Sequence, residues 1–211
     1  MRSIGTILVI ALAAGCNNGA VQNGGAPAAP DSFTVALATS KGMMELMVHR
    51  DWAPVGVDRF YYLLQNDFYD QARFFRVVPH FVAQFGMPAD PSFTQRYAKD
   101  PIPDDRPRHS NLRGTVSFAH AGPGTRGSQM FINLKDNLKL DSGMVPFAPI
   151  GEIRSGGSAI DSLNGEYNNP AGGPDQGMIG ALGNSYLNST FPRLDYITTA
   201  RITREWKPAG R

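Results

Sequence analysis

The sequence predicts a mainly β domain, and three observations lead to this fold class. Apolar and β-branched residues gather in short runs bounded by turn residues, which is typical of antiparallel strands. The 211 residues include 23 Gly and 16 Pro without a triplet repeat, which indicates many turns and excludes collagen. Only two segments have a helical period. Because 42% of the residues are hydrophobic, the chain can bury a core, and we expect one closed or sandwiched antiparallel domain.

Eight short apolar runs define the expected strands. Lys41-Gly42 is a turn signal between the first two runs and predicts a hairpin. Pro79 ends the third run, and Pro146 and Pro149 reduce the seventh to an edge or bulged strand. The expected strands are residues 33–37, 43–48, 74–78, 81–85, 114–119, 130–134, 145–153 and 196–203.

Two helices are expected between these strands. Residues 55–65 carry apolar side chains at helical spacing on one face, and Pro54 suits the first turn of a helix. Residues 155–163 predict a shorter second helix, because Ile160 and Leu163 fall on the same face.

The start of the chain has the order of a bacterial secretory signal. Arg2 precedes an apolar run over residues 4–14, which is too short to span a bilayer. Residues 12–16, Leu-Ala-Ala-Gly-Cys, resemble a lipobox, with the leucine one position further from the cysteine than usual. We therefore expect residues 1–15 to be a lipoprotein-type signal peptide and Cys16 to be lipidated. The alternative is an ordinary secretory peptide that ends near a chance cysteine.

The next residues predict a spacer followed by one domain. Residues 16–30 carry no charge and few bulky side chains, so we expect a flexible tether with a reach of roughly 20 Å. The folded domain is expected at 31–205, followed by a C-terminal tail at 206–211. An anchor on Cys16 would hold the protein in the cell envelope, facing the periplasm or the exterior. Asn17 is not the Asp that marks inner-membrane retention, which favours the outer membrane.

Composition and motifs argue against several function classes. A net charge of +2 without basic runs gives no sign of a nucleic-acid partner. One cysteine excludes an internal disulfide framework and a cysteine-cluster metal site. Residues 122–127 match G-x-G-x-x-G, but a strand follows them where a dinucleotide site needs a helix. Asp104-Asp105 is expected in a solvated loop. The four histidines are His49, His80, His109 and His120, and their spacing is not that of metal ligands. We therefore expect no metal and no cofactor.

Arg76 is the remaining candidate. It lies in an aromatic strand run, with Phe81 and Gln84 near it along one hairpin-like unit. One interpretation is a core strand whose arginine reaches solvent or pairs with a carboxylate. The other is a functional arginine beside an apolar surface.

Two long motifs carry a family resemblance. Residues 68–86 read FYDQARFFRVVPHFVAQFG, and residues 113–132 read RGTVSFAHAGPGTRGSQMFI. In sequence and spacing the chain resembles the cyclophilin-type peptidyl-prolyl cis-trans isomerases over roughly residues 32–205. The resemblance implies an eight-stranded antiparallel β-barrel capped by two α-helices, with the active groove on its outer face.

The resemblance also implies the roles of individual residues. Arg76 aligns with the catalytic arginine, Gln84 with the glutamine that orients it, and Phe81 with a wall of the proline pocket. Further walls and groove contacts are implied at Val82, Ala119, His120, Ala121, Gln129, Phe131, Leu140 and Met144. Ala119 and Ala121 would line the groove for the residues before proline, and Gln129 would bind peptide backbone.

Some positions depart from the family pattern. His120 replaces an Asn whose backbone makes the main contact, Lys139 replaces an aromatic residue, and Met144 replaces a His of the proline pocket. The segment 166–193 is also long, and it is either an elaborated loop near the groove or a mere excursion.

Two functions remain open on these residues. The first is an isomerase that accelerates X-Pro rotation in exported proteins, with proline-containing polypeptides as partners and the protein as a monomer. The second, motivated by Lys139 and Met144, is a tethered proline-peptide binding or assembly module with little turnover.

Overall fold

The computed structural model describes residues 28–168 and 172–207. The expected signal peptide, Cys16 and most of the expected tether lie outside the described residues. Ala29 and Pro30 are already buried, and the N–H of Ala29 donates to Asp58 Oδ1 at 2.9 Å. The folded part therefore begins at least two residues before the expected boundary at 31.

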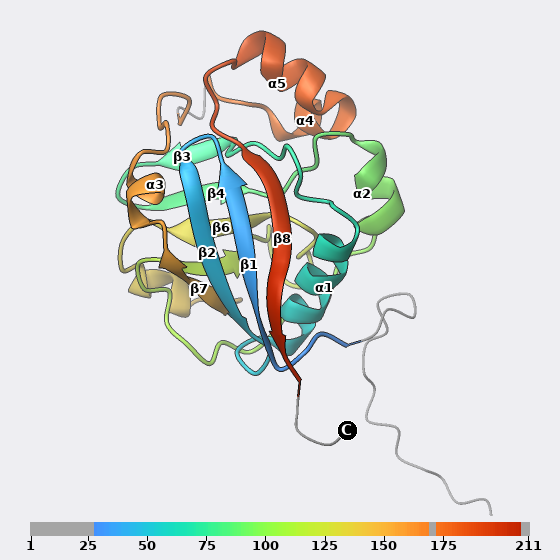
Figure 1. Ribbon diagram of the computed structural model, residues 1–211. Coiled ribbons are helices and arrows are strands. Elements are labelled where there is room, and N and C mark those ends of the chain that lie inside the picture. The colour runs from blue at the N-terminus through green and yellow to red at the C-terminus, as the bar shows by residue number, and fades with distance from the viewer. Residues whose placement is uncertain (1–27, 169–171, 208–211) are drawn as a thin grey trace, which may run out of the picture.

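Eight antiparallel strands form one sheet, so the mainly β fold class is confirmed (Figure 1). The strands are β1 (Ser32–Thr39), β2 (Gly42–His49), β3 (Arg76–Val78), β4 (Val82–Phe85), β5 (Thr115–Phe118), β6 (Met130–Asn133), β7 (Pro149–Ser155) and β8 (Ile197–Trp206). Their order in the sheet is β3-β4-β6-β5-β7-β2-β1-β8. The predicted hairpin is confirmed, since β1 and β2 pair in register with Thr39 opposite Gly42.

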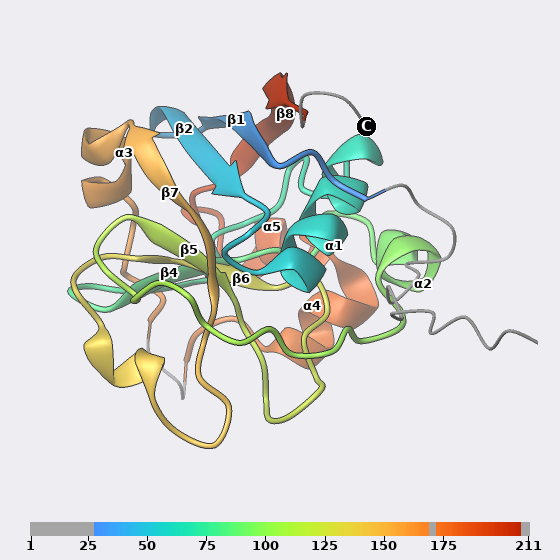
Figure 2. The ribbon, with the colours of Figure 1, turned by 90° about the horizontal axis from the view of Figure 1, so that it is seen from below.

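The sheet curves, so that β1 and β2 lie above β4 and β6 in the view of Figure 2. Its two edge strands, β3 and β8, are joined through the segments that precede them. An isolated bridge joins Arg73, just before β3, to Tyr196, just before β8. The N–H of Phe74 donates to the carbonyl of Asp195 at 2.8 Å, and the N–H of Ile197 donates to the carbonyl of Ala72 at 2.9 Å. These bonds satisfy backbone groups that an open sheet edge would expose.

Strand β7 lies in the middle of the sheet, between β5 and β2. The alternative of an edge strand is therefore wrong, and the bulged strand is confirmed by register shifts in both of its pairings. Pro149 is tolerated because it is the first residue of the strand.

Helices surround the sheet in greater number than the two that were expected. In the described part of the chain they are α1 (Pro54–Gln65), α2 (Ser92–Tyr97), α3 (Gly157–Asp161), α4 (Gln176–Leu182) and α5 (Asn184–Thr190), with a 3₁₀ turn at Leu138–Asp141. The two expected helices correspond to α1 and α3. Among residues 28–168 and 172–207, no helix has the length and apolar character needed to cross a membrane.

Helix α1 packs on the main core through buried Val57, Phe60, Leu63 and Leu64. Its first turn is held by Asp105, whose carboxylate accepts from the N–H groups of Val55 at 3.0 Å and Gly56 at 2.8 Å. Arg126 Nη1 donates to the same carboxylate at 2.9 Å. Asp105 is therefore a buried helix cap, and its expected place in a solvated loop is wrong.

Helices α4 and α5 belong to a second, smaller core. Phe75, Ile179, Leu187, Phe191 and Leu194 form it. Both helices lie at the end of the molecule opposite the point where β8 ends (Figure 1). The described residues of the 166–193 segment, 166–168 and 172–193, are therefore packed on the rest of the molecule, and we call them the α4–α5 insertion.

Candidate functional site

Arg76 and Gln84 face each other across the β3–β4 pair. Their Cα atoms are direct partners in the ladder, which places both side chains on the same face of the sheet. The tight turn between the strands includes His80 at φ 58°, a left-handed backbone that forces the chain to reverse. Arg76 Nη1 donates to Gln84 Oε1 at 3.4 Å, which is long for such a bond.

An apolar hollow of about 190 Å³ opens beside this pair. It is lined by Arg76, Phe81, Val82, Gln84, Ala119, His120, Phe131, Leu140 and Phe147. Phe131 and Phe147 meet edge to face, with ring centroids 5.4 Å apart. The arginine is the only permanently charged side chain in this lining, so its guanidinium borders a surface of aromatic and aliphatic carbon.

His120 is part of the wall, and its ring stacks on Phe147 at 4.1 Å between centroids. Neither ring nitrogen makes a hydrogen bond of ordinary geometry to the described residues, although the backbone of Val145 lies close enough to the ring to raise its pKa. Burial lowers the pKa of His120, and the opposing charges of Asp104 and Arg126 act more weakly. The imidazole is therefore neutral near pH 7.

A second hollow of about 350 Å³ adjoins the first and shares Gln84, Ala119 and His120 with it. Its other lining residues are Met87, Pro88, Thr94, Ala98, Ala121, Thr125, Gly127, Ser128, Gln129 and Gln176. The two hollows together form a groove that runs from β3 to α4, which is the groove referred to below. Asp, Glu, Lys and Arg are absent from the lining of the second hollow.

A close backbone approach sets the spacing between the two glutamines of the groove. Gly86 has φ +98°, and a Cβ there would lie 2.5 Å from the carbonyl oxygen of Ser128. Only glycine allows this contact. It holds the end of β4 against residue 129, so that Gln84 Nε2 donates to Gln129 Oε1 at 2.9 Å.

The structure brings ten of the eleven predicted catalytic and substrate-binding residues to this groove. Met144 is the exception: it is 91% exposed and lines neither hollow. Gly143, at φ 117°, turns the chain outward there, and the chain returns where the N–H of Phe147 donates to the carbonyl of Leu140 at 2.9 Å. Phe147 forms the wall that was expected of Met144.

Nine of the nineteen lining residues were missed by the sequence reasoning, among them Phe147 and Gln176. Phe147 lies in the 145–153 run that was expected to be an edge or bulged strand, so its aromatic ring gave no separate signal. Gln176 lies in the long segment whose position relative to the groove was left open, and nothing local in the sequence connects it to Gln129.

The groove offers limited chemistry. Within the described ranges no three His, Cys, Asp or Glu side chains come together as metal ligands would. What the groove presents is one guanidinium, several amide groups and an apolar recess. Such a site can bind a peptide and stabilise a developing lone pair by a hydrogen bond.

Comparison with known proteins agrees with this arrangement. The family described as "Cyclophilin type peptidyl-prolyl cis-trans isomerase/CLD" matches residues 34–178. Peptidyl-prolyl cis-trans isomerase A of Dickeya dadantii is 34% identical over 141 residues, which cover 65% of this chain and 74% of that protein. A peptidyl-prolyl cis-trans isomerase of Synechococcus elongatus is 41% identical over 105 residues, covering 50% and 71% respectively.

Solved structures share the fold at lower identity. A cyclophilin type peptidyl-prolyl cis-trans isomerase of Cryptosporidium parvum superposes with a TM-score of 0.60 at 18% identity, covering 83% of this chain and 99% of that one. The same protein crystallised in the presence of the dipeptide Ala-Pro gives a TM-score of 0.59, with 82% and 99% covered. The chain belongs to the cyclophilin-type peptidyl-prolyl cis-trans isomerases and is an enzyme of that family.

Proposed function

We propose that this enzyme accelerates X-Pro rotation through Arg76, acting on prolines seated in the apolar hollow. The observation that carries the proposal is the register of β3 and β4, which sets Arg76 and Gln84 side by side at the rim of that hollow. The relative crystallised with Ala-Pro was exposed to a dipeptide of the class that we propose for this site.

The chemistry of the X-Pro bond explains why an arginine is suitable. Rotation is slow because amide resonance is lost, with a barrier of about 18–20 kcal/mol. In the twisted state the prolyl nitrogen is pyramidal and carries a lone pair, which a fixed donor stabilises more than either planar state. A guanidinium is always charged and only donates, so it suits this role.

The apolar wall supplies the complementary part of the mechanism. Phe81, Phe131 and Leu140 hold the pyrrolidine ring by burial while the preceding carbonyl turns. Gln84 accepts from Arg76 and thereby limits the directions in which the guanidinium points. No covalent intermediate is required, because only a rotation separates substrate from product.

The test is the Arg76→Ala variant. We expect kcat/KM for a proline tetrapeptide to fall by about two orders of magnitude, comparable to the loss of an oxyanion donor. The measurement is exchange NMR, with thermal unfolding to confirm the fold. Arg113→Ala is the matched control, because that exposed arginine pairs with Asp161 and lines neither hollow.

Equal inactivity of the wild type and Arg76→Ala would contradict the catalytic proposal. If the wild type then bound proline peptides tightly, the groove would instead serve as a binding or assembly module.

We further propose that the enzyme is a monomer attached to the cell envelope by a lipid on Cys16, and that its substrates are exported proteins. The support is the signal-like sequence that precedes Cys16 and the uncharged stretch that follows it. Cys16→Ser should move the protein from the membrane fraction to the soluble fraction. Unchanged membrane recovery of this variant would contradict the anchor.

A further inference from the structure

The α4–α5 insertion is fixed firmly to the rest of the molecule. The N–H of Asn184 donates to the carbonyl of Ala89 at 2.9 Å, and its side chain donates to the carbonyl of Gln71 at 3.0 Å. Arg73 Nη2 donates to Asn188 Oδ1 at 2.6 Å. The insertion therefore contacts both the segment that leads into β3 and the segment that follows β4.

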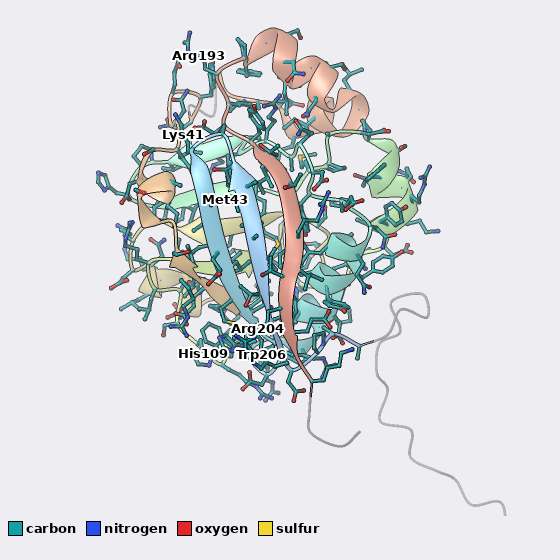
Figure 3. All side chains as sticks on the ribbon, viewed as in Figure 1. Lys41, Met43, His109, Arg193, Arg204 and Trp206 are labelled. Carbon is teal, nitrogen blue, oxygen red and sulfur yellow. The ribbon has the colours of Figure 1, made fainter. Side chains whose placement is uncertain are left out.

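The ends of the insertion are also joined to each other. Arg193 Nε donates to Glu166 Oε2 at 2.8 Å, and Figure 3 shows Arg193 at the exposed margin of this segment. Phe75, directly before Arg76, is 2% exposed within the small core that the insertion completes. The insertion thus packs against the residue next to the catalytic arginine.

A hydrogen-bonded chain of amides leads from the insertion into the site. Gln129 Nε2 donates to Gln176 Oε1 at 3.0 Å, and Gln176 is the first residue of α4. Gln84 Nε2 donates to Gln129 Oε1 at 2.9 Å, and Gln84 Oε1 accepts from Arg76. The second hollow lies along this chain and is lined by all three glutamines.

The direction of this chain is set by elementary donor and acceptor chemistry. A guanidinium has no acceptor, so Gln84 must turn its oxygen toward Arg76 and its NH₂ group toward Gln129. Gln129 must then present its oxygen to Gln84, which leaves its own NH₂ group facing outward. An acceptor at position 176 completes this chain of hydrogen bonds. A donor there would favour the opposite orientation of the Gln129 amide, with its oxygen turned toward position 176.

We infer that Gln176 is a positioning residue for the isomerisation, acting through Gln129 and Gln84 on Arg76. This inference rests on the proposed function of Arg76. The insertion supplies the terminal acceptor that keeps both groove amides in the orientation that Arg76 requires. Gln176 is exposed, so water replaces part of its contribution when it is removed, and the effect is one of degree.

The experiment compares three replacements of Gln176 by kcat and KM from exchange NMR. Gln176→Glu keeps an acceptor and should stay within about twofold of the wild type. Gln176→Met has similar length without a strong acceptor, and Gln176→Lys offers only donors. Both should lower kcat about three- to tenfold, which corresponds to the loss of one ordinary hydrogen bond.

Controls separate positioning from a structural role. Leu182→Gln changes an exposed residue of the same helix that lines neither hollow, and it should leave kcat unchanged. Thermal unfolding of all variants should agree within experimental error. If kcat is kept in Gln176→Glu but lowered in Gln176→Met, and the two variants unfold at the same temperature, loosening of α4 cannot explain the difference.

Two outcomes would overturn the inference. One is activity of Gln176→Met and Gln176→Lys within twofold of the wild type. The other is an equal loss in all three variants, including Glu. Arg76→Ala, measured alongside, decides the proposed function separately, because its loss of activity does not depend on position 176.

Discussion

The groove has two sides that are built by different means. The side that holds the apolar hollow beside Arg76 is built on neighbouring strands, where ladder register alone sets Arg76 opposite Gln84 and Gln84 opposite Phe131. The other side is the α4–α5 insertion, which reaches the groove by contacts between residues far apart in the chain, such as Gln176 with Gln129. The family match ends at residue 178, within α4.

Because of this difference, a single substitution should disturb the structure of the insertion side more than that of the strand side. On the strand side, Gln84 and Phe131 each lie on a strand that has a neighbour on both sides, so small changes there are absorbed by the sheet. On the insertion side, the junction of α4 and α5 depends on Gly183, which has φ +57° and ψ −138°. A Cβ at Gly183 would overlap the carbonyl oxygen of Ala89 and lie 2.7 Å from Pro91 Cδ.

The largest effect should come from Gly183→Ala. Backbone strain and the clash with Ala89 together should lower the free energy of unfolding by about 3 kcal/mol, unless the insertion detaches first. Since local opening relieves the clash, we expect faster hydrogen exchange in α4 and α5 and unchanged protection in β5 and β6. Activity should fall only to the level of Gln176→Met.

The matched control is Gly180→Ala in the middle of α4. Its Cβ would meet only Met87 Cε at 3.9 Å, so this change should stabilise the helix by about 0.5–1 kcal/mol. Faster exchange throughout the whole sheet in Gly183→Ala would contradict the independence of the two sides. So would a loss of activity as large as that of Arg76→Ala.

The same distinction explains what the sequence could predict. Arg76 and Gln84 are eight positions apart in one hairpin, so their proximity follows from local patterning, and all eight strands were located for the same reason. The sequence did not predict that β3 and β4 would be so short, because the ends of these strands depend on the turns around them.

Other positions could not be predicted from local sequence patterns. Asp105 caps a helix about fifty residues earlier in the chain, and its Pro- and Arg-rich neighbours gave no sign of burial. The family resemblance implied that Met144 lines the proline pocket, but the turn at Gly143 carries its side chain into solvent. Gln176 became a candidate only when folding brought α4 to Gln129. Asp105 and Gln176 depend on docking between separate segments, which periodicity does not encode, and Met144 depends on the backbone conformation of a single loop.

The smallest effect concerns pH and distinguishes the strand side from the insertion. Burial lowers the pKa of His120 below its ordinary value of 6.5, so the unfolded chain binds more protons than the folded chain at mildly acidic pH. Stability from this group is complete above about pH 6.5 and is lost as the pH falls. Burial also lowers the pKa of His49, which stacks on Trp52 and lines neither hollow.

His120→Asn and His49→Asn should therefore each flatten the acid side of the stability curve, by less than about 1 kcal/mol, as measured by urea unfolding between pH 5 and pH 7. Only His120→Asn should also flatten the acid side of kcat/KM, because protonation of His120 places a positive charge in the wall of the apolar hollow. An acid limb of kcat/KM that persists in His120→Asn would show that the ring does not control the groove. Because His120 borders both hollows while the insertion carries no titrating group into them, any pH dependence of substrate preference should arise on the strand side.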